Sequence, residues 1–401
     1  MNSVVTMGLG YIGLPTSALI ASNNIPVFGV DINEHVVQTI NKGNIHIQEP
    51  LLDKIVASTV QKGIFKAGTE PIPADVYLIV VPTPFKKNHE PDISFIENAT
   101  RKIIPLLKEG DLYIIESTSP VGTTEKMHDV IISERPELKG KVHVAYCPER
   151  VLPGNVIKEL VSNDRVIGGI NEKSTKTAIK FYSKFVEGEL HATDSKTAEM
   201  CKLTENASRD VQIAFANELS LICDKAGINV WELIQLANKH PRVNILNPGC
   251  GVGGHCIAVD PYFITSSFPL ESRIISTARE LNNYKAFYCI EKIKNEINSF
   301  ELENKIKPRV AICGLTFKPD IDDLRESPAL YIANNIKNYH KSELVFFVEP
   351  NLQNSNEVPL TDFEDACSDS DIIVFLVAHK AFKHFKKIKN QTIISFVNQI
   401  N

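Results

Sequence analysis

Short apolar runs alternate with helical stretches at both ends of this chain, and this alternation constrains its fold more than any other feature. The N-terminal runs cover residues 4–7, 27–30, 76–81, 112–116 and 142–146. The C-terminal runs cover residues 310–313, 344–348, 372–377 and 393–396. Strands that alternate with helices pair in parallel through right-handed crossovers. The sequence therefore predicts an α/β protein with two parallel sheets, of which the C-terminal one is smaller.

A helical block separates the two α/β parts. Residues 196–226 contain no Pro or Gly, and their apolar side chains recur at the spacing of a helix. We expect one long helix there, followed by shorter helices at about 229–238 and 272–298. Further helices are expected at 328–338 and 362–368, between the C-terminal strands.

Length and composition exclude several classes of protein. A chain of 401 residues is too long for one ordinary core, so two or three domains are expected. Its net charge of -5 favours neither nucleic acid nor anionic lipid as a partner. No apolar run reaches the roughly 18 residues of a membrane span. The first run is interrupted at Gly8 and Gly10, which is unlike a signal peptide.

The eight cysteines are scattered and lack CxxC spacing. This pattern predicts reduced thiols, a cytoplasmic location and no metal site. Most of these cysteines are expected to be small buried side chains. A glycine-rich segment, described below, singles out one exception.

The segment Gly8-Leu9-Gly10-Tyr11-Ile12-Gly13 follows the first apolar run and opens a helix. In this context G-x-G-x-x-G predicts a dinucleotide site, because the glycines permit a tight turn, a close approach to pyrophosphate and close helix packing. Asp31 ends the next run, about 20 residues further on, where a carboxylate binds ribose hydroxyls. It would repel a 2′-phosphate, so NAD is expected rather than NADP.

Two threonines follow the ends of expected strands, where ligands bind in parallel sheets. Thr83 follows the run 76–81, and Thr118 follows the run 112–116. Either hydroxyl can bind the cofactor or a water molecule, and a role as a loop cap explains both equally well.

The segment 248–256, Pro-Gly-Cys-Gly-Val-Gly-Gly-His-Cys, is rich in glycine and ends at Cys256. Backbone N–H groups that converge in such a loop lower the pKa of a thiol and favour its use as a nucleophile. Asp260 follows four residues later. It shares a face with Cys256 if a helix begins at Cys256.

Lys202 and Asn206 lie one turn apart in the predicted long helix. A cation and an amide donor together suit a developing oxyanion, although an exposed helix face is the commoner reason for such a pair. Glu149 follows the run 142–146, and a carboxylate there can act as a base on water.

Together these segments resemble the UDP-sugar 6-dehydrogenase family, which contains UDP-glucose, GDP-mannose and UDP-N-acetylhexosamine dehydrogenases. The resemblance covers nearly the whole chain, in the same order. The match is closest to the branch that oxidises UDP-N-acetyl-D-mannosamine. It is carried by residues 147–154 (CPERVLPG), 198–206 (AEMCKLTEN), 240–244 (HPRVN), 251–256 (GVGGHC), 260–262 (DPY), 314–319 (GLTFKP) and 322–327 (DDLRES).

The resemblance implies three domains. They are a Rossmann-type NAD-binding domain at 1–192, a central all-helical dimerisation domain at 193–300 and a smaller Rossmann-like UDP-sugar-binding domain at 301–401. The implied reaction is a four-electron oxidation of a UDP-N-acetylhexosamine at C6, with two NAD per sugar. The implied partner is a second copy of the chain, bound through the central helix.

Catalytic roles follow from the same resemblance. Cys256 would form a thiohemiacetal and then a thioester, and Glu149 would activate the water that releases the acid. Lys202 and Asn206 would stabilise the oxyanion. Asp260 would orient water or the lysine.

Binding roles are implied as well. Thr118 is also expected to hold a water near the nicotinamide. Cofactor contacts are implied for Gly8, Gly10, Tyr11, Ile12, Gly13, Asp31, Thr83, Thr118 and Arg325. Substrate contacts are implied for Arg150, Val151, Lys202, Asn206, Arg209, His240, Arg242, Gly253 and Lys318.

Three positions depart from the family pattern. Cys250 stands where relatives carry Pro, which leaves the glycine loop freer. Pro153 stands where the UDP-glucose branch has an acidic residue, which argues against UDP-glucose. Residues 395–398 lack the Asp and Gly that follow the last strand in relatives, at the edge of the nucleotide pocket.

Three alternatives stay open from the sequence. The substrate is UDP-N-acetylglucosamine or UDP-N-acetylgalactosamine in the first, because a few pocket contacts distinguish such epimers. The second is a two-electron hydroxyacid dehydrogenase of the same helical-dimer architecture, which needs no nucleophilic thiol. The third is a catalytically silent protein that binds nucleotide sugars.

Overall fold

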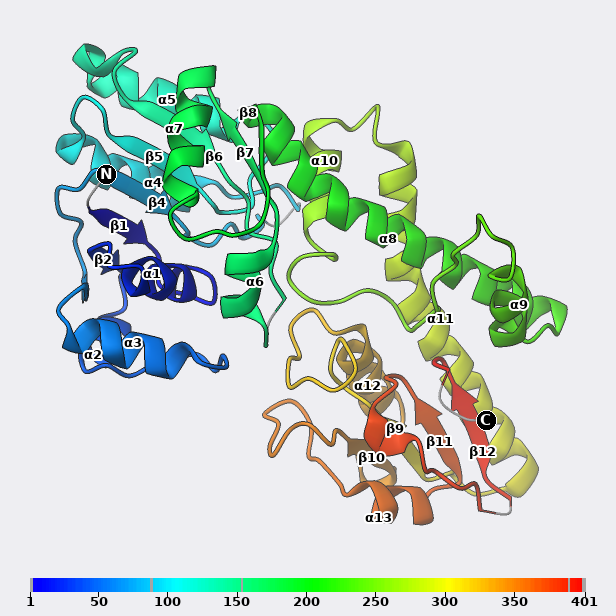
Figure 1. Cartoon of the computed structure of the whole chain (residues 1–401). Helices are drawn as coiled ribbons and strands as arrows, with labels where there is room; N and C mark the ends of the chain where they lie inside the picture. The colour runs from blue at the N-terminus through cyan, green and yellow to red at the C-terminus, as the bar shows by residue number, and fades with distance from the viewer. Residues whose placement is uncertain (1–2, 87–88, 153, 389, 399–401) are drawn as a thin grey trace. The chain divides into compact units, whose positions relative to one another are not determined.

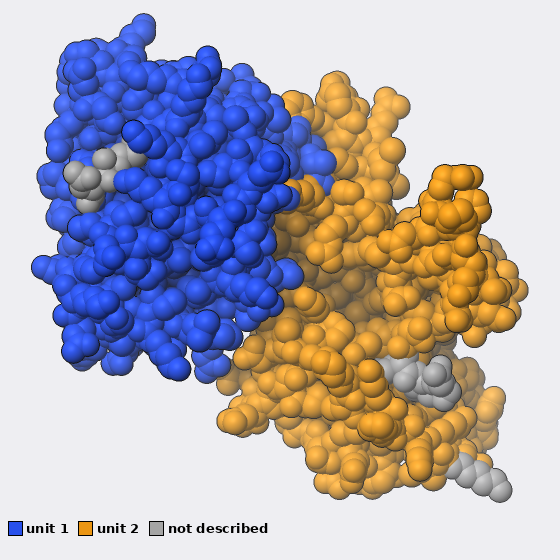
Figure 2. All heavy atoms as spheres, viewed as in Figure 1, with its two compact units in different colours: residues 1–204, 262–267 blue, residues 205–261, 268–401 orange. Residues whose placement is uncertain are grey.

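The computed structural model describes residues 3–86, 89–152, 154–388 and 390–398, so the departure at Pro153 lies outside the described residues. The chain forms two compact units, which Figure 2 colours separately. The first contains residues 1–204 and 262–267, and the second contains residues 205–261 and 268–401. Helices α8 (Ser195–Ala226) and α10 (Asp260–Ser267) contribute residues to both. No helix among the described residues is long and apolar enough to cross a membrane.

One sheet with the strand order β3-β2-β1-β4-β5-β6-β7-β8 forms the centre of the first unit (Figure 1). Its neighbouring strands run parallel, except that β6 and β7 are antiparallel. The strands are β1 (Val4–Met7), β2 (Val27–Val30), β3 (Phe65–Gly68), β4 (Val76–Ile79), β5 (Leu112–Ile115), β6 (His143–Tyr146), β7 (Arg165–Gly169) and β8 (Leu190–Asp194).

Helices connect these strands and cover both faces of the sheet. The α-helices are α1 (Gly13–Ser22), α2 (Glu34–Asn41), α3 (Leu52–Gln61), α4 (Ser94–Ile103), α5 (Thr123–Glu134), α6 (Val156–Ser162) and α7 (Glu172–Tyr182). Two short 3-10 turns are η1 (Ile104–Leu106) and η2 (Pro136–Leu138).

Alternate side chains of each central strand enter two different hydrophobic cores. Val4 and Leu78 belong to one core, whereas Val5 and Ile79 belong to the other. Successive side chains of a strand point to opposite faces of a sheet. The unbroken apolar runs of the sequence therefore reflect a sheet that is buried on both faces.

The helices of the second unit enclose buried polar residues. They are the C-terminal part of α8, α9 (Val230–Ala237) and the long α11 (Arg273–Asn304). Arg279 of α11 pairs with Asp210 of α8 through Nη1 and Oδ1 at 2.9 Å, and both are almost fully buried. Asn282 donates a hydrogen bond of 2.8 Å to the same carboxylate oxygen. These contacts fix the register of α8 against α11.

A smaller parallel sheet with the order β10-β9-β11-β12 completes the second unit. Here too the strands alternate between two cores, since Val310 and Ala311 lie in different clusters. The elements are β9 (Val310–Cys313), α12 (Pro328–Tyr339), η3 (Ser342–Leu344), β10 (Val345–Val348), α13 (Phe363–Ser368), β11 (Ile372–Phe375), η4 (Lys380–Phe382) and β12 (Thr392–Ser395).

The predicted α/β, helical, α/β order is confirmed, with each expected strand and long helix within a few residues of its predicted position. Two details of the first sheet were not predicted. The sequence did not indicate β3, β7 and β8, and the expectation of a wholly parallel sheet is wrong for β6 and β7. The side chains of strand β8 are exposed or only partly buried. This explains why the hydrophobic pattern did not predict it.

Candidate active site

The first βα turn has the geometry that a bound pyrophosphate needs. Gly8 has a φ of +96°, and a Cβ there would lie 2.6 Å from the carbonyl oxygen of Val80. A Cβ at Gly13 would lie 1.9 Å from the carbonyl oxygen of Gly8. No described atom lies within 4 Å of a Cβ placed at Gly10. The turn is therefore tight at its ends and open in the middle, as a dinucleotide requires.

The carboxylate of Asp31 is fixed beside this turn. Its two oxygens accept hydrogen bonds from the backbone N–H groups of Leu9, at 3.0 Å, and Asn33, at 2.9 Å. The side chain stays partly exposed. Exposed Tyr11 and partly buried Ile12 lead into α1, whose N-cap has no side-chain hydrogen bond. Within the first turn of α1, Leu14 donates its N–H to the Gly10 carbonyl oxygen at 3.1 Å.

The loops that follow β4 and β5 are joined to each other. Ser117 donates a hydrogen bond of 2.7 Å to the carbonyl oxygen of Val81. Thr83 and Thr118 lie in these two loops, and both are partly buried. The strand order places the loops side by side at the carboxyl edge of the sheet. Both threonines therefore follow strand ends at this edge, as the sequence predicted.

Lys202 and Glu149 come together in the first unit. The ammonium group of Lys202, in α8, donates a hydrogen bond of 2.8 Å to the backbone carbonyl oxygen of Glu149. The Glu149 carboxylate is buried, and its Oε1 accepts a hydrogen bond of 2.6 Å from the Arg150 N–H. Arg150 also donates to the carbonyl oxygen of Asp164, and Val151 packs against the core.

A buried polar cluster, which the sequence did not reveal, surrounds Glu149. Arg165 lies 3.3 Å from Glu149 Oε2 through Nη1, and its guanidinium carbon lies 5.1 Å from the centre of the Tyr182 ring. The Tyr182 hydroxyl donates a hydrogen bond of 2.5 Å to Glu116. Burial raises the pKa of Glu116 to about 7, although Arg165 lowers it. A charged residue that opens a strand, as Arg165 does, is the one available sequence signal.

Glu199 has a structural role within residues 198–206, one of the segments that resemble the family. This carboxylate of α8 is fully buried and accepts hydrogen bonds from the N–H groups of Gly122, at 2.6 Å, and Thr124, at 2.8 Å. It therefore caps the N-terminus of α5, which has no cap of its own. The same contacts anchor the turn of α8 that precedes Lys202.

In the second unit, the glycine loop before Cys256 packs tightly against the C-terminal domain. Gly254, at a φ of +80°, donates its N–H to the carbonyl oxygen of Arg325 at 3.0 Å. A Cβ at Gly253 would lie 2.4 Å from the carbonyl oxygen of Glu326. Only glycine fits there, because it has no Cβ to meet these neighbours.

Asp260 contacts Asn206, whereas the resemblance implied that Asp260 orients water or Lys202. The Asn206 amide donates a hydrogen bond of 2.5 Å to Asp260 Oδ2. The condition for a shared helix face, a helix that begins at Cys256, is not met, because α10 begins at Asp260. One turn still connects the two residues, since the Asp260 N–H donates to the Cys256 carbonyl oxygen at 2.8 Å. Residues 251–253 have no regular secondary structure, and bends and a turn follow them. The regular helix therefore begins only at Asp260.

The buried network between α8 and α11 also holds the loop from both sides of Cys256. Asn217 accepts a hydrogen bond of 2.9 Å from the Gly249 N–H, and Arg279 donates one of 3.3 Å to the Ile257 carbonyl oxygen. Cys256 itself is partly buried. It belongs to a different unit from Lys202, so the expected approach of these two residues stays a prediction.

Cys250, the departure from the family proline, is a core residue. It is 5% exposed, and its thiol donates a hydrogen bond of 3.5 Å to the Leu376 carbonyl oxygen. Burial raises its pKa to about 12. The loop is therefore anchored at residue 250 by burial and a hydrogen bond.

The remaining predicted binding residues are exposed polar groups of the second unit. Arg325 pairs with Asp323 through Nη2 and Oδ2 at 2.6 Å. His240 accepts a hydrogen bond of 3.3 Å from the Arg242 N–H through Nδ1. Lys318 and Arg209 are exposed.

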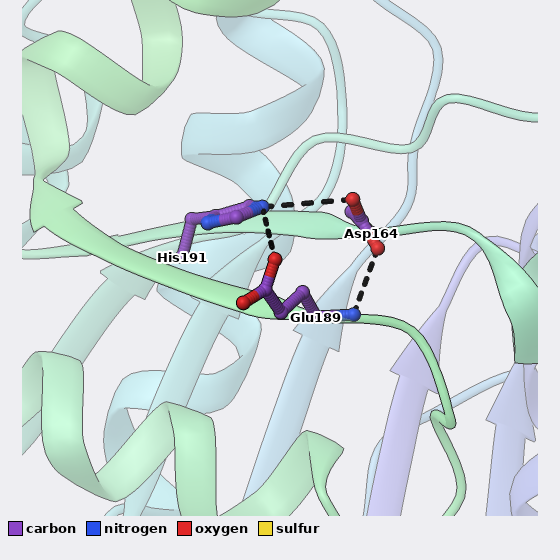
Figure 3. A group of neighbouring side chains, drawn as sticks. All are labelled: Asp164, Glu189 and His191. Carbon is purple, nitrogen blue, oxygen red and sulfur yellow. Dashed lines mark hydrogen bonds and ion pairs between the residues drawn. The ribbon is translucent and has the colours of Figure 1, made fainter.

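Three exposed polar side chains form a group at the edge of the first sheet. His191 Nε2 lies 3.6 Å from Asp164 Oδ2 and 3.8 Å from Glu189 Oε2 (Figure 3). The Glu189 N–H donates to Asp164 Oδ1 at 2.8 Å. All three side chains are at least half exposed. These contacts join the start of β7 to β8 and lie outside the predicted site.

Three family models match this chain in the order of its parts. The NAD binding domain of the UDP-glucose/GDP-mannose dehydrogenase family matches residues 2–186. The central domain of that family matches residues 196–284, and its UDP binding domain matches residues 311–400.

Individual relatives are similar over nearly the full chain. A UDP-N-acetyl-D-mannosamine dehydrogenase of Campylobacter jejuni is 51% identical over 411 residues, which cover 98% of this chain and 99% of the relative. An NDP-N-acetyl-D-galactosaminuronic acid dehydrogenase of Ralstonia nicotianae is 52% identical over 394 residues, which cover 95% and 92%. The structure of UDP-D-ManNAc dehydrogenase from Pyrococcus horikoshii has a TM-score of 0.87 at 37% identity, covering 100% of this chain and 96% of that one.

These matches confirm the fold class, the NAD cofactor and the family that the sequence indicated. The open turn at Gly10 and the fixed carboxylate of Asp31 fit that cofactor. The chain belongs to the UDP-glucose/GDP-mannose dehydrogenase family and is an NAD-dependent UDP-sugar dehydrogenase.

Proposed function

We propose that this protein oxidises UDP-N-acetyl-D-mannosamine at C6 to the uronate, with two NAD per sugar. The observation that carries the proposal is the glycine loop of Cys256, which backbone contacts hold on one side and the Asn206–Asp260 hydrogen bond holds on the other. The name of the Campylobacter jejuni relative, at 51% identity, supports the choice of sugar.

In the proposed reaction Cys256 keeps the substrate attached between two oxidations. NAD, when bound, accepts a hydride in each oxidation. The C6 alcohol becomes an aldehyde, and the Cys256 sulfur adds to its carbon to form a thiohemiacetal. Loss of the second hydride gives a thioester, and water then cleaves the C–S bond to release the acid and restore the thiol. Because the aldehyde stays tethered, the second oxidation is intramolecular.

The neighbouring groups serve the charges that develop in these steps. Asn206 and Lys202 stabilise the oxyanion that forms when sulfur or water adds to the carbonyl carbon. Asp260 orients Asn206, with which it shares a hydrogen bond. Glu149 accepts a proton from the attacking water, and Thr118 holds a water near the nicotinamide.

The binding roles divide between the two units. In the first, Gly8, Gly10, Gly13, Asp31 and Thr83 contact NAD, with Tyr11 and Ile12 at the start of α1, whereas Arg150 and Val151 contact the UDP-sugar. In the second, Arg325 reaches the NAD pyrophosphate, for which its planar fork is suited. There the UDP-sugar contacts Gly253, Arg209, His240, Arg242 and Lys318.

The larger organisation is part of the proposal. We assign NAD binding to residues 1–192, dimerisation to 193–300 and UDP-sugar binding to 301–401, and the family models that match 2–186, 196–284 and 311–400 support this division. The protein acts as a homodimer through α8. It works in the cytoplasm, where a nucleophilic thiol stays reduced.

A second substrate is favoured by a specific observation. The Ralstonia nicotianae relative, at 52% identity, is named for N-acetyl-D-galactosaminuronic acid. NADH formation with UDP-N-acetylmannosamine, UDP-N-acetylglucosamine, UDP-N-acetylgalactosamine and UDP-glucose separates the candidates. The highest kcat/KM is expected for UDP-N-acetylmannosamine. A higher value for any other sugar would overturn the assignment, and tight UDP binding without turnover would favour a silent binding protein.

The nucleophile is tested by Cys256→Ala. Formation of the uronate is expected to fall by at least about a thousandfold, because the tether between the two oxidations is lost. Cys201→Ser is the matched control, since Cys201 is also partly buried, and it should retain most activity. NADH formation that survives in the Cys256 variant, without accumulation of aldehyde, would instead point to a two-electron hydroxyacid dehydrogenase.

A further inference from the structure

A chain of buried polar side chains crosses between α8 and α11 in the second unit. Its four members, two on each helix, are at most 2% exposed, and they are Asp210, Asn217, Arg279 and Asn282. We call these four residues the α8–α11 path. Burial of amides and charges is costly unless they pair with one another. The packing of two helices does not require such groups, so the path calls for another explanation.

The first half of the path starts on the backbone before Cys256. The Gly249 N–H donates a hydrogen bond of 2.9 Å to Asn217 Oδ1, and the Asn217 amide donates one of 2.9 Å to Asn282 Oδ1. The Asn282 amide donates in turn to Asp210 Oδ1 at 2.8 Å. The beginning of the glycine loop is thereby joined to both helices.

The second half of the path returns to the backbone just after Cys256. Asp210 Oδ1 pairs with Arg279 Nη1 at 2.9 Å, and the same nitrogen donates a hydrogen bond of 3.3 Å to the Ile257 carbonyl oxygen. One path thus holds the segment 249–257 at both of its ends. Glycine restricts its own backbone little, so contacts with neighbouring residues must fix the position of the Cys256 sulfur.

The path also includes the part of α8 that carries Asn206. Asp210 lies one turn after Asn206, so the two side chains share a face of the helix. Asn206 donates to Asp260 Oδ2 at 2.5 Å, and the Asp260 N–H donates to the Cys256 carbonyl oxygen at 2.8 Å. Two routes therefore join this face of α8 to the backbone around Cys256, one through Asp260 and one through Arg279.

Stability alone does not explain the ion pair in this path. Within the described part of the chain, Asp210 Oδ2 and Arg279 Nε have no hydrogen-bond partner. A buried ion pair whose remaining polar atoms lack partners contributes little net stability, and apolar residues of similar volume often replace it without loss. The contact with Ile257, next to Cys256, is therefore the more informative feature of the pair.

We propose that Asp210 and Arg279 are positioning residues that hold the Cys256 thiol against the reacting C6 carbon between the two oxidations. The proposal rests on the proposed function, in which the Cys256 sulfur adds to the aldehyde carbon. While the loop is held, this addition occurs before the aldehyde leaves. Without the pair the sulfur meets the carbon less often, so part of the aldehyde is released after a single hydride transfer to NAD.

Asp210→Leu combined with Arg279→Met tests the proposal, because it removes the pair without leaving one buried charge alone. The measurement is the molar ratio of NADH to uronate formed from UDP-N-acetylmannosamine by the full-length protein. Each uronate accounts for two NADH and each released aldehyde for one, so the wild-type ratio is expected to be two. In the double variant the ratio should rise to about three or more.

The kinetic constants provide a second readout for the same double variant. The kcat for uronate is expected to fall by about 10- to 100-fold, since a small displacement of a reacting group has an effect of this size. KM should stay within about threefold of the wild-type value, because no residue proposed to bind the UDP-sugar is changed. A smaller fraction of folded protein would lower NADH and uronate together and leave their ratio at two.

Asn217→Leu acts at the other end of the path and provides a second variant in case the double variant fails to fold. It removes the hydrogen bond to Gly249, so its ratio of NADH to uronate should also exceed two. Asp224→Asn is the matched control, because it weakens an exposed ion pair with Lys292 that joins the same two helices further along α8. Its ratio should remain at two.

Amide hydrogen exchange of residues 249–257, measured by mass spectrometry, tests the hold on the loop without any need for activity. Exchange in this segment is expected to be at least about tenfold faster in the double variant and in Asn217→Leu, because local opening then breaks fewer contacts. Asp224→Asn should exchange at the wild-type rate.

The outcomes separate this inference from the proposed function. Wild-type protein that forms no NADH with any UDP-sugar would contradict the proposed function, and exchange would still decide whether the path holds the loop. Active wild-type protein whose variants keep a ratio of two, or exchange at the wild-type rate, would overturn the role of Asp210 and Arg279 alone. A ratio above two with faster exchange, absent from the Asp224 control, would establish it.

Discussion

Two glycines of the first βα turn are expected to serve different purposes, Gly13 in stability and Gly10 in binding of the cofactor. A Cβ at residue 13 would lie 1.9 Å from the carbonyl oxygen of Gly8, and no rotation of a side chain can relieve that overlap. Gly13→Ala is therefore expected to lower the free energy of unfolding by at least about 2 kcal/mol. Gly10→Ala meets no described atom within 4 Å, so its stability should stay within about 0.5 kcal/mol of wild type.

For NAD binding the order of the two variants is reversed, and Gly10→Ala is expected to have the larger effect. A methyl group at residue 10 occupies the space that the pyrophosphate needs, so Gly10→Ala should weaken NAD binding by at least about tenfold. Urea unfolding and NAD titration by calorimetry measure the two effects. Gly10→Ala protein that is destabilised as much as Gly13→Ala protein, or that binds NAD normally, would show that the turn is not a pyrophosphate site.

At the scale of elements, a buried acid joins the ends of β10 and β11 in the second unit. Glu349 Oε2 accepts hydrogen bonds from His379 Nε2, at 3.0 Å, and from the N–H groups of Leu315 and Thr316, at 2.8 and 3.1 Å. Burial alone would raise the pKa of Glu349, but these hydrogen bonds outweigh it and lower the pKa to about 2.

This shift predicts how stability depends on pH. A folded-state pKa below the usual 4.5 contributes stability above pH 4.5, which is lost as the pH falls toward 2. Glu349→Gln should therefore cost up to about 3 kcal/mol at pH 7 and roughly 1 kcal/mol less at pH 3.5. Urea unfolding at both values measures this, with exposed Glu357→Gln as the control. A cost that is independent of pH would contradict the assignment.

Local patterns predicted some of these elements because their signals lie within a few residues of one another. The apolar run at β1 and the glycines after it predicted the dinucleotide turn, and helical spacing predicted α8. Arg165 and Glu149, by contrast, meet only through the order of β6 and β7. No local sequence pattern predicts such a pair, since the strand order decides which residues meet. The same holds for Asn217, whose partner Gly249 lies in a distant loop.

At the scale of the whole molecule, the two sheets repeat one βα turn with different chemistry. Gly8 and Gly314 both have left-handed φ values, +96° and +92°, and each donates its N–H to the end of the neighbouring strand at 2.8 Å. An acid follows that strand in both cases. Asp31 stays partly exposed, whereas Glu349 is buried against His379. Only the first turn therefore presents a carboxylate to a ribose.

The exposed apolar side chains of α8 are relevant to the proposed homodimer. Phe215 and Ile222 are 51% and 57% exposed, and they lie two turns apart with Leu219 between them. Residues at this spacing share one face of a helix. We call these three residues the α8 stripe. Isolated exposed apolar side chains are ordinary, but a contiguous stripe on a long helix is typical of a surface that another protein covers.

The proposed homodimer predicts that the α8 stripe is buried between two copies of the chain. Phe215→Asp combined with Ile222→Asp should therefore convert a particle of about twice 44.6 kDa into one of that mass, as measured by light scattering after gel filtration. Ile72→Asp is the control, because it places the same charge on an exposed apolar residue of the first unit. A double variant that keeps the wild-type mass would exclude the stripe as the dimer contact, whereas wild-type protein of 44.6 kDa would exclude the homodimer.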